Sequence, residues 1–198
     1  MGFNLSQSFI NSFSKNLISW YNLNKRELPW RNTNDPYKIW LSEIILQQTK
    51  IVQGLPYYIR FVNKYPNIKK LALSSEKEVI KLWEGLGYYS RARNLHKTAK
   101  IVIKNYDGIF PSKYETLIKL PGIGDYTASA ISSFSINEIN PVLDGNVYRF
   151  LSRLFGIDIP INTNKSFREF KNIAKKLISR KNPSDFNQAI MEFGSLVC

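Results

Sequence analysis

The chain of 198 residues is 43% hydrophobic and 22% charged, a composition that is typical of globular proteins and sufficient for a buried core. Its 28 Lys+Arg and 15 Asp+Glu give a formal net charge of +13, so nucleic acid is the first partner to consider, with a solvated basic surface as the alternative. The single cysteine excludes an internal disulfide, and the absence of a signal-peptide pattern or a membrane-spanning apolar run predicts a cytoplasmic protein without membrane partners.

Apolar residues recur with helical spacing along almost the whole chain, and no alternating strand pattern or repeat is visible. The first such pattern predicts one helix face, formed by Tyr37, Trp40, Leu41, Ile44, Ile45 and Gln48. Further on, Ser75 and Glu78 form a predicted capping box at the start of a helix that Gly85 ends.

Ser112 and Glu115 predict a second capping box at the start of a short helix, and we expect Asp125 to cap the helix that follows. The remaining helices are expected at about residues 147–155, 167–179 and 184–197. The predicted fold class is therefore all-α.

Two short predicted helices are joined by Leu120-Pro121-Gly122-Ile123-Gly124. Glycines here permit positive φ and let a phosphate approach bare backbone N–H groups at the start of the next helix. The pattern is typical of a helix-hairpin-helix, at about residues 112–135, which binds the DNA backbone independently of sequence. A tight turn without a ligand is the alternative.

Glu43 points away from the main apolar face of its predicted helix and has Ile39 and Leu46 as neighbours. If that side lines a pocket, burial would raise the pKa of Glu43 and keep a proton available near neutral pH. The alternative is an exposed helix glutamate.

Asp144 lies between an apolar connector and the start of a helix. A carboxylate there accepts backbone N–H bonds, which would lower its pKa and keep it ionised; simple helix capping is the alternative. Together, a protonated Glu43 and an ionised Asp144 would suit hydrolysis of an N-glycosidic bond, which needs an acid for the departing base and an anion beside the sugar cation.

Two further segments carry side chains suited to DNA. Tyr88 follows two glycines and precedes Arg91, so the segment combines backbone freedom, a stacking ring and a cation. Gln47, Gln48 and Thr49 offer polar groups for base edges. Either segment could instead be ordinary surface.

Five motifs in chain order together resemble the MutY-type adenine DNA glycosylases: Leu28–Arg31, Trp40–Thr49, Gly85–His96, Leu120–Gly124 and Leu143–Val147. The resemblance implies a two-lobed helix-hairpin-helix glycosylase fold. Its first lobe would be a six-helix barrel at residues 29–140, and residues 1–28 with 141–198 would form the second. It also implies a monomeric, monofunctional, bacterial glycosylase that releases adenine mispaired with 8-oxoguanine or guanine from double-stranded DNA in base-excision repair.

By this resemblance Glu43 protonates adenine at N7, and Asp144 stabilises or captures the sugar cation. Tyr126 and Asn146 would hold these two carboxyl groups in place. The resemblance assigns DNA or base contacts to Arg31, Leu46, Gln48, Thr49, Tyr88, Arg91, Pro121, Gly122 and Gly124.

Two departures leave alternatives open. Relatives of the endonuclease III type, which are glycosylases with AP-lyase activity, have a nucleophilic lysine where this chain has Tyr126, and a phenol cannot form the required imine. In the family, Cys198 would be the first ligand of a [4Fe–4S] cluster, but the remaining ligands are missing from these 198 residues, so we expect no cluster here. A catalytically impaired DNA-binding fragment is therefore a further hypothesis. For the lone His96 we expect a surface or capping role.

Overall fold

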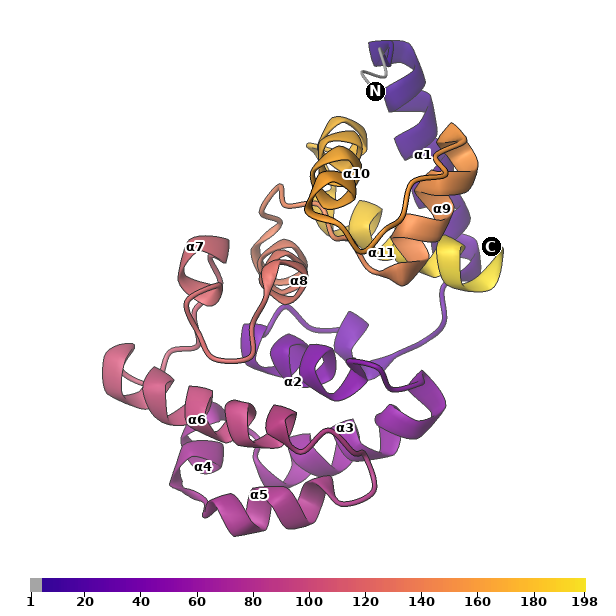
Figure 1. Ribbon diagram of the computed structural model, residues 1–198. Helices are drawn as coiled ribbons and strands as arrows, with labels where there is room; N and C mark the ends of the chain where they lie inside the picture. Colours follow the sequence, from indigo (N-terminus) through magenta and orange to yellow (C-terminus); the bar gives the residue numbers. More distant parts are fainter. Residues whose placement is uncertain (1–4) are drawn as a thin grey trace. The chain divides into compact units, whose positions relative to one another are not determined.

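The computed structural model describes residues 5–198, and this part of the chain is all-helical, as predicted (Figure 1). It divides into two compact units. One comprises the residues up to Glu27 together with Asn137–Cys198, and the other is Leu28–Ile136. For this second unit, which corresponds to the first lobe predicted from the sequence, the expected limits are residues 29 and 140. They differ from Leu28 and Ile136 by one and four residues.

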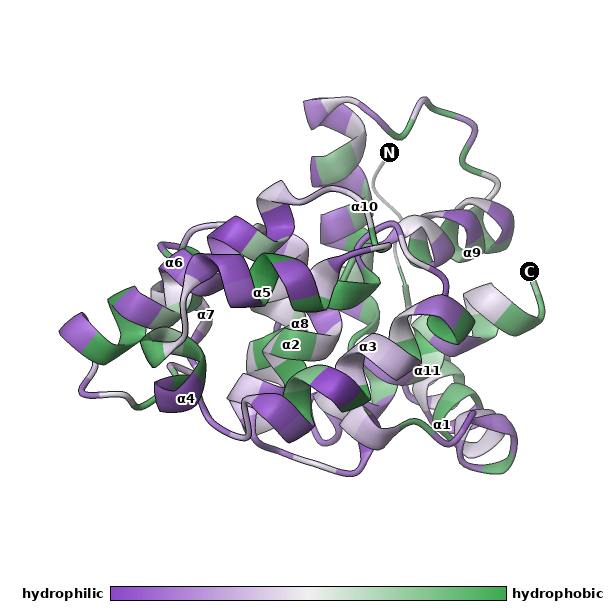
Figure 2. Ribbon diagram, turned by 90° about the horizontal axis from the view of Figure 1, so that it is seen from below, coloured by the Kyte–Doolittle hydropathy of each residue, from purple (hydrophilic) through white to green (hydrophobic). Residues whose placement is uncertain are grey.

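Residues 28–136 contain a short 3₁₀ helix and the helices that follow it: Pro29–Arg31 (η1), Pro36–Leu46 (α2), Ile51–Lys64 (α3), Ile68–Leu73 (α4), Glu76–Trp83 (α5), Ser90–Asn105 (α6), Tyr114–Leu117 (α7) and Asp125–Ile136 (α8). Helix α2 packs against α3, α6 and α8, and it is largely hydrophobic (Figure 2). The expectation of a single apolar face on α2 is wrong, because consecutive residues from Ile39 to Ile45 are all buried. Neighbouring helices cover α2 on several sides.

The first residues of α5, α7 and α8 test the capping residues predicted from the sequence. The box at α5 is confirmed, since the Glu78 N–H donates to Ser75 Oγ (3.2 Å) and the Ser75 N–H donates to Glu78 Oε2 (2.9 Å). The second box is wrong: Lys113 caps α7 without a side-chain hydrogen bond, which shifts the helix by one residue from the Ser112 register. Asp125 lies inside the first turn of α8, where its carboxylate accepts a hydrogen bond from the Tyr114 hydroxyl (2.8 Å).

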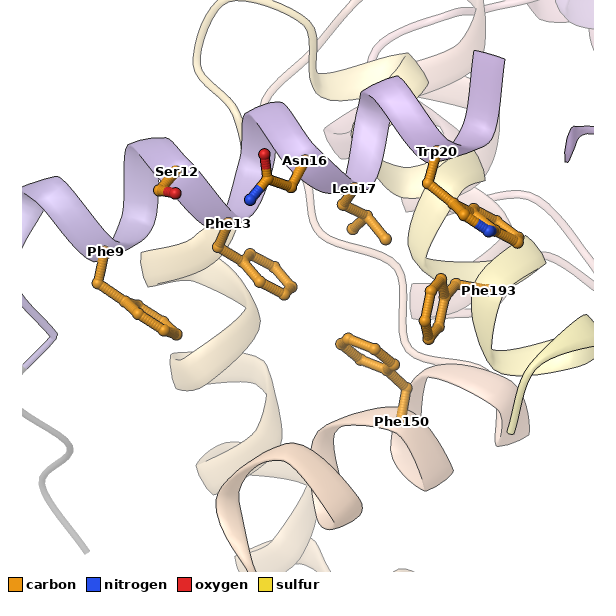
Figure 3. Close-up of a pocket in the computed structure, with 8 residues that line it drawn as sticks. All are labelled: Phe9, Ser12, Phe13, Asn16, Leu17, Trp20, Phe150 and Phe193. Carbon is orange, nitrogen blue, oxygen red and sulfur yellow. The ribbon is translucent and has the colours of Figure 1, made fainter. Parts of the chain in front are cut away.

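The other unit contains Gln7–Asn24 (α1), Gly145–Phe155 (α9), Asn164–Leu177 (α10) and Pro183–Leu196 (α11). Both α1 and α9 pack against α11. An apolar pocket of about 320 Å³ lies between α1, Phe150 of α9 and Phe193 of α11, and Phe13, Leu17 and Trp20 of α1 extend toward these two rings (Figure 3). The rings of Phe150 and Phe193 meet edge to face with centroids 5.4 Å apart, so aromatic packing holds these helices together.

An ion pair with a buried carboxylate joins the segment after α1 to α11. The Glu192 side chain is 1% exposed and accepts hydrogen bonds from the Arg26 backbone N–H (2.9 Å), Nε (2.9 Å) and Nη2 (2.6 Å). Such bidentate pairing offsets the cost of removing the Glu192 carboxylate from water, while the Arg26 side chain stays 37% exposed. None of the helices between residues 5 and 198 is long and apolar enough to cross a membrane.

We expect Gly194→Ala to lower the free energy of unfolding. A Cβ at this position would lie 2.5 Å from the Asn146 carbonyl oxygen and 2.8 Å from its carbon, so α11 would have to move away from α9. Overpacking of this kind costs roughly 1–3 kcal/mol, which thermal unfolding followed by circular dichroism can measure. Gly124→Ala is the control, because its Cβ would meet nothing within 4 Å. Equal melting temperatures for the two variants would contradict close packing of α11 on α9.

Candidate functional site

Glu43 lies in the middle of α2 and is only 8% exposed, so the alternative of an exposed glutamate is wrong. Its helix packs against α8, whose first turn carries the half-buried Tyr126. The Gln47 side-chain amide donates to Thr127 Oγ1 at 3.4 Å, which joins the end of α2 to the same turn of α8. The structure thus places Glu43 and Tyr126 on two helices in contact.

Asp144 caps α9, as predicted: its Oδ1 accepts the Val147 backbone N–H at 2.8 Å. Its Oδ2 accepts the Asn146 side-chain amide, also at 2.8 Å. Asn146 therefore contacts the carboxylate that it was expected to hold. These bonds fix both oxygens of Asp144 at the first turn of the helix.

Arg149 completes this arrangement, and sequence reasoning missed it. Its Nη2 donates to Asn146 Oδ1 (2.7 Å) and to the Gly194 carbonyl oxygen (2.6 Å). Because a guanidinium only donates hydrogen bonds, Arg149 fixes the amide oxygen of Asn146 toward itself and the amide nitrogen toward Asp144. The available signal was spacing, since residues three apart lie on the same side of a helix.

The pKa of Asp144 corrects an expectation. Burial raises it above the ordinary value, while hydrogen bonds from Val147 and Asn146 and the charge of Arg149 lower it. Burial is the largest of these effects, so the expected net lowering from helix capping is wrong. The contacts around Asp144 limit the rise of its pKa without reversing it.

The hairpin between α7 and α8 uses its two glycines differently. Gly122 has φ of 77°, and a Cβ on it would lie 3.0 Å from Asn94 Cβ, so this position favours glycine for conformation and for space. Gly124 has no positive φ and faces open space. The Pro121 carbonyl oxygen accepts the Thr98 hydroxyl at 2.9 Å, which fixes the hairpin to α6.

The other residues expected to contact DNA differ in exposure. Tyr88 is 64% exposed and Gln48 is also exposed, whereas Arg31, Leu46 and Thr49 are half-buried. Gln48 and Tyr88 both have left-handed backbone, with φ of 54° and 47°. Such conformations are uncommon in residues other than glycine and concentrate at functional segments.

Burial of Arg91 and His96 overturns one expectation and decides between two alternatives for the other. Arg91 is 9% exposed, and its guanidinium donates to backbone carbonyls inside the fold, so its expected contact with DNA phosphate is wrong. His96 is 2% exposed and does not lie at the surface. Its Nε2 lies 2.9 Å from the Ser74 carbonyl oxygen at the end of α4, which agrees with a capping role, and burial lowers the pKa of His96.

Cys198 follows α11, and its carbonyl oxygen accepts a hydrogen bond from Arg153. Within residues 5–198, no group of three or more His, Cys, Asp or Glu side chains is placed to hold a metal ion. A [4Fe–4S] cluster takes four protein ligands. The one thiol in this sequence does not fit that requirement.

Comparison with known proteins identifies the family. Residues 41–180 match the model described as "HhH-GPD superfamily base excision DNA repair protein". The chain belongs to the HhH-GPD superfamily. It is 43% identical over 187 residues to the adenine DNA glycosylase of Buchnera aphidicola subsp. Acyrthosiphon pisum, covering 94% of this chain and 53% of that protein. It is 39% identical to the human adenine DNA glycosylase over 96% of this chain and 36% of the relative.

This HhH-GPD chain thus spans about half or less of the length of these relatives. Among solved structures, a thermostable thymine-DNA glycosylase is similar with a TM-score of 0.85 and 28% identity, covering 94% of this chain and 86% of the other. An endonuclease III–DNA complex shares the fold, with a TM-score of 0.79 and 21% identity over 97% and 87% of the two chains.

In this HhH-GPD chain we expect Arg149→Gln to raise the pKa of Asp144 further, because it removes a positive charge and frees the Asn146 amide. A raised folded-state pKa adds stability below the ordinary value of 3.8 that is lost as the pH rises through the folded pKa. The variant should therefore lose more stability near neutral pH than below 3.8.

Carbon-13 NMR titration of the labelled Asp144 carboxyl measures the shift directly. Arg153→Gln is the matched control, since it removes an arginine from the same helix that donates to the Cys198 carbonyl oxygen. An unchanged titration of Asp144 in Arg149→Gln would contradict the role given to Arg149.

Proposed function

We propose that the chain is a monofunctional DNA glycosylase that hydrolyses the N-glycosidic bond of adenine mispaired with 8-oxoguanine or guanine in double-stranded DNA. The observation that carries the proposal is the burial of Glu43 within α2. A carboxyl group in so apolar a helix costs stability unless it is protonated or paired, so a buried glutamate in this position is a candidate for a catalytic role. The similarity to adenine DNA glycosylases supports adenine as the base.

In the proposed reaction each carboxyl group has one task. Glu43 donates a proton to the departing adenine, so that the base leaves as a neutral molecule. Asp144, as an anion, stabilises the positive charge that develops on the sugar, and water then completes hydrolysis. Asn146 and Arg149 orient Asp144 through the bonds described above.

Position 126 favours hydrolysis over a lyase reaction. A lyase of the endonuclease III type needs an amine nucleophile, and Tyr126 supplies a phenol at this turn of α8. The retention of Glu43, Asp144 and the contacts around Asp144 argues against the hypothesis of an impaired DNA-binding fragment.

DNA binding is proposed from charge and from the hairpin. The formal net charge is +13, and Gly124 leaves open space beside the first turn of α8, where backbone N–H groups attract phosphate. Gln48 and Tyr88 are the side chains that would enter the duplex. We propose that the chain acts as a monomer.

We expect Glu43→Gln to abolish adenine release while duplex binding is retained, because the amide keeps the shape of the side chain but has no acid proton. General acid catalysis contributes about 10²–10⁴-fold in rate. Single-turnover release of adenine opposite 8-oxoguanine, quantified by chromatography, measures the loss, and fluorescence anisotropy measures binding. Release at the wild-type rate would remove Glu43 from the mechanism.

We expect Gly124→Ala to weaken duplex binding without loss of stability. The methyl group would enter open space in the free protein but obstruct a phosphate at the backbone N–H groups. Removal of one charge-assisted hydrogen bond should weaken the affinity by roughly tenfold or more. The slope of log affinity against log salt should fall by about 0.9 for each phosphate that the variant no longer binds. A weaker affinity with an unchanged slope would place the effect elsewhere.

A further inference from the structure

Arg91 joins two segments that are far apart in the sequence. One is the end of α2, where its Nη1 donates to the carbonyl oxygens of Ile44 (3.1 Å), Ile45 (3.0 Å) and Gln47 (2.5 Å). The other is the turn between α5 and α6, where its Nη2 donates to the carbonyl oxygens of Leu86 (3.3 Å) and Gly87 (3.4 Å). Both nitrogens also approach Thr49 Oγ1, at 3.3 and 3.4 Å.

The chemistry of the guanidinium suits this bridge. Carbonyls in the last turn of a helix lack partners within the helix and form the negative end of its dipole. A planar guanidinium presents donors in a fixed fork, so it can bond two backbone segments at once. Its Cζ also lies 5.0 Å from the Trp83 ring centroid, and Trp83 Nε1 donates to the Gly87 carbonyl oxygen (2.9 Å). The turn is therefore held from two sides.

Each bridged segment carries a residue on strained backbone. Gln48 has φ of 54°, and Tyr88 has φ of 47°. Left-handed backbone in such residues costs free energy and persists only where the surroundings determine it. Both residues lie next to carbonyls that Arg91 binds, those of Gln47 and Gly87. Arg91 is thus a partner common to the two strained positions.

We propose that Arg91 is a positioning residue that fixes the segment 47–49 and the turn 85–88 in one arrangement, so that Gln48 and Tyr88 engage the duplex as a pair. The part concerning the duplex rests on the proposed function. Arg91 itself does not touch DNA, because the fold buries its guanidinium. Its effect on binding and base release passes through the backbone of the two segments.

Arg91→Lys tests the bridge, since lysine keeps the positive charge but lacks the planar fork. Arg93→Lys is the matched control: it makes the same change on the same helix, at an exposed arginine 3.6 Å from Glu76. Hydrogen exchange of the free protein should become faster in peptides covering both 47–50 and 85–89, with α8 unchanged. Wild-type protection in either segment of Arg91→Lys would overturn the bridge.

A binding cycle separates positioning from general stability. Tyr88→Ala should weaken duplex binding by about tenfold in the wild-type background, the effect of losing one stacked ring. In the Arg91→Lys background, where the ring is already misplaced, the same substitution should have an effect of less than roughly twofold. An equal loss in both backgrounds would mean that Arg91 supports stability alone.

A second cycle leaves Arg91 intact, so it remains decisive if Arg91→Lys folds poorly. Gln48→Ala and Tyr88→Ala each alter a side chain that is not part of the core. Their combined effect on affinity should differ from the product of the single effects by at least about twofold. Multiplicative effects would contradict the pairing. If the wild-type chain binds duplex but releases no adenine, the proposed function is refuted, and both cycles still decide the role of Arg91. If the wild-type chain binds no duplex, the proposed function and the role of Arg91 in binding are both refuted.

Discussion

The burial of α2 is the constraint on which the unit at Leu28–Ile136 depends. A helix covered by α3, α6 and α8 must satisfy its polar groups internally, and its C-terminal carbonyls find their donors in Arg91. The same burial surrounds Glu43 with protein and places a carboxyl group where water is scarce. One packing arrangement therefore supports the core, the proposed acid and the backbone of the segment that follows α2. A change that loosened α2 would affect all three together.

In the unit that contains residues 137–198, several contacts act together on the pKa of Asp144. Its carboxylate is desolvated, and desolvation alone favours protonation. Hydrogen bonds from Val147 and Asn146 oppose this effect, and Arg149 orients the Asn146 amide while also binding the Gly194 carbonyl. The close contact of Gly194 with Asn146 makes α11 part of the support. A site that keeps a partly desolvated anion is less stable than an apolar one, a trade-off common at catalytic positions.

The fold class, most helices and the cap at Asp144 could be predicted because periodicity and capping are local properties of the sequence. The register of α7 could not, since Ser112 and Lys113 compete as the cap within one residue. The burial of Arg91 was not predictable either. The α2 carbonyls of Ile44 and Ile45 that it binds lie more than forty residues away in the sequence, and an arginine beside glycines and tyrosines equally suits a phosphate contact. The direction of the pKa shift of Asp144 could not be predicted from helix capping, because it depends mainly on burial of the carboxyl group in the folded protein. Sequence thus located the candidate residues, whereas their burial and hydrogen-bond partners depend on tertiary packing.

The proposed chemistry requires that this chain hydrolyses the bond between adenine and its sugar and leaves the DNA strand intact. A duplex labelled on the adenine strand, with adenine opposite 8-oxoguanine, tests this requirement when the products are separated with and without mild alkali. We predict that the strand breaks at the adenine position only after alkali, because an abasic site has formed and Tyr126 cannot act as a lyase nucleophile. Breakage without alkali, or no breakage after it, would contradict the proposed hydrolysis.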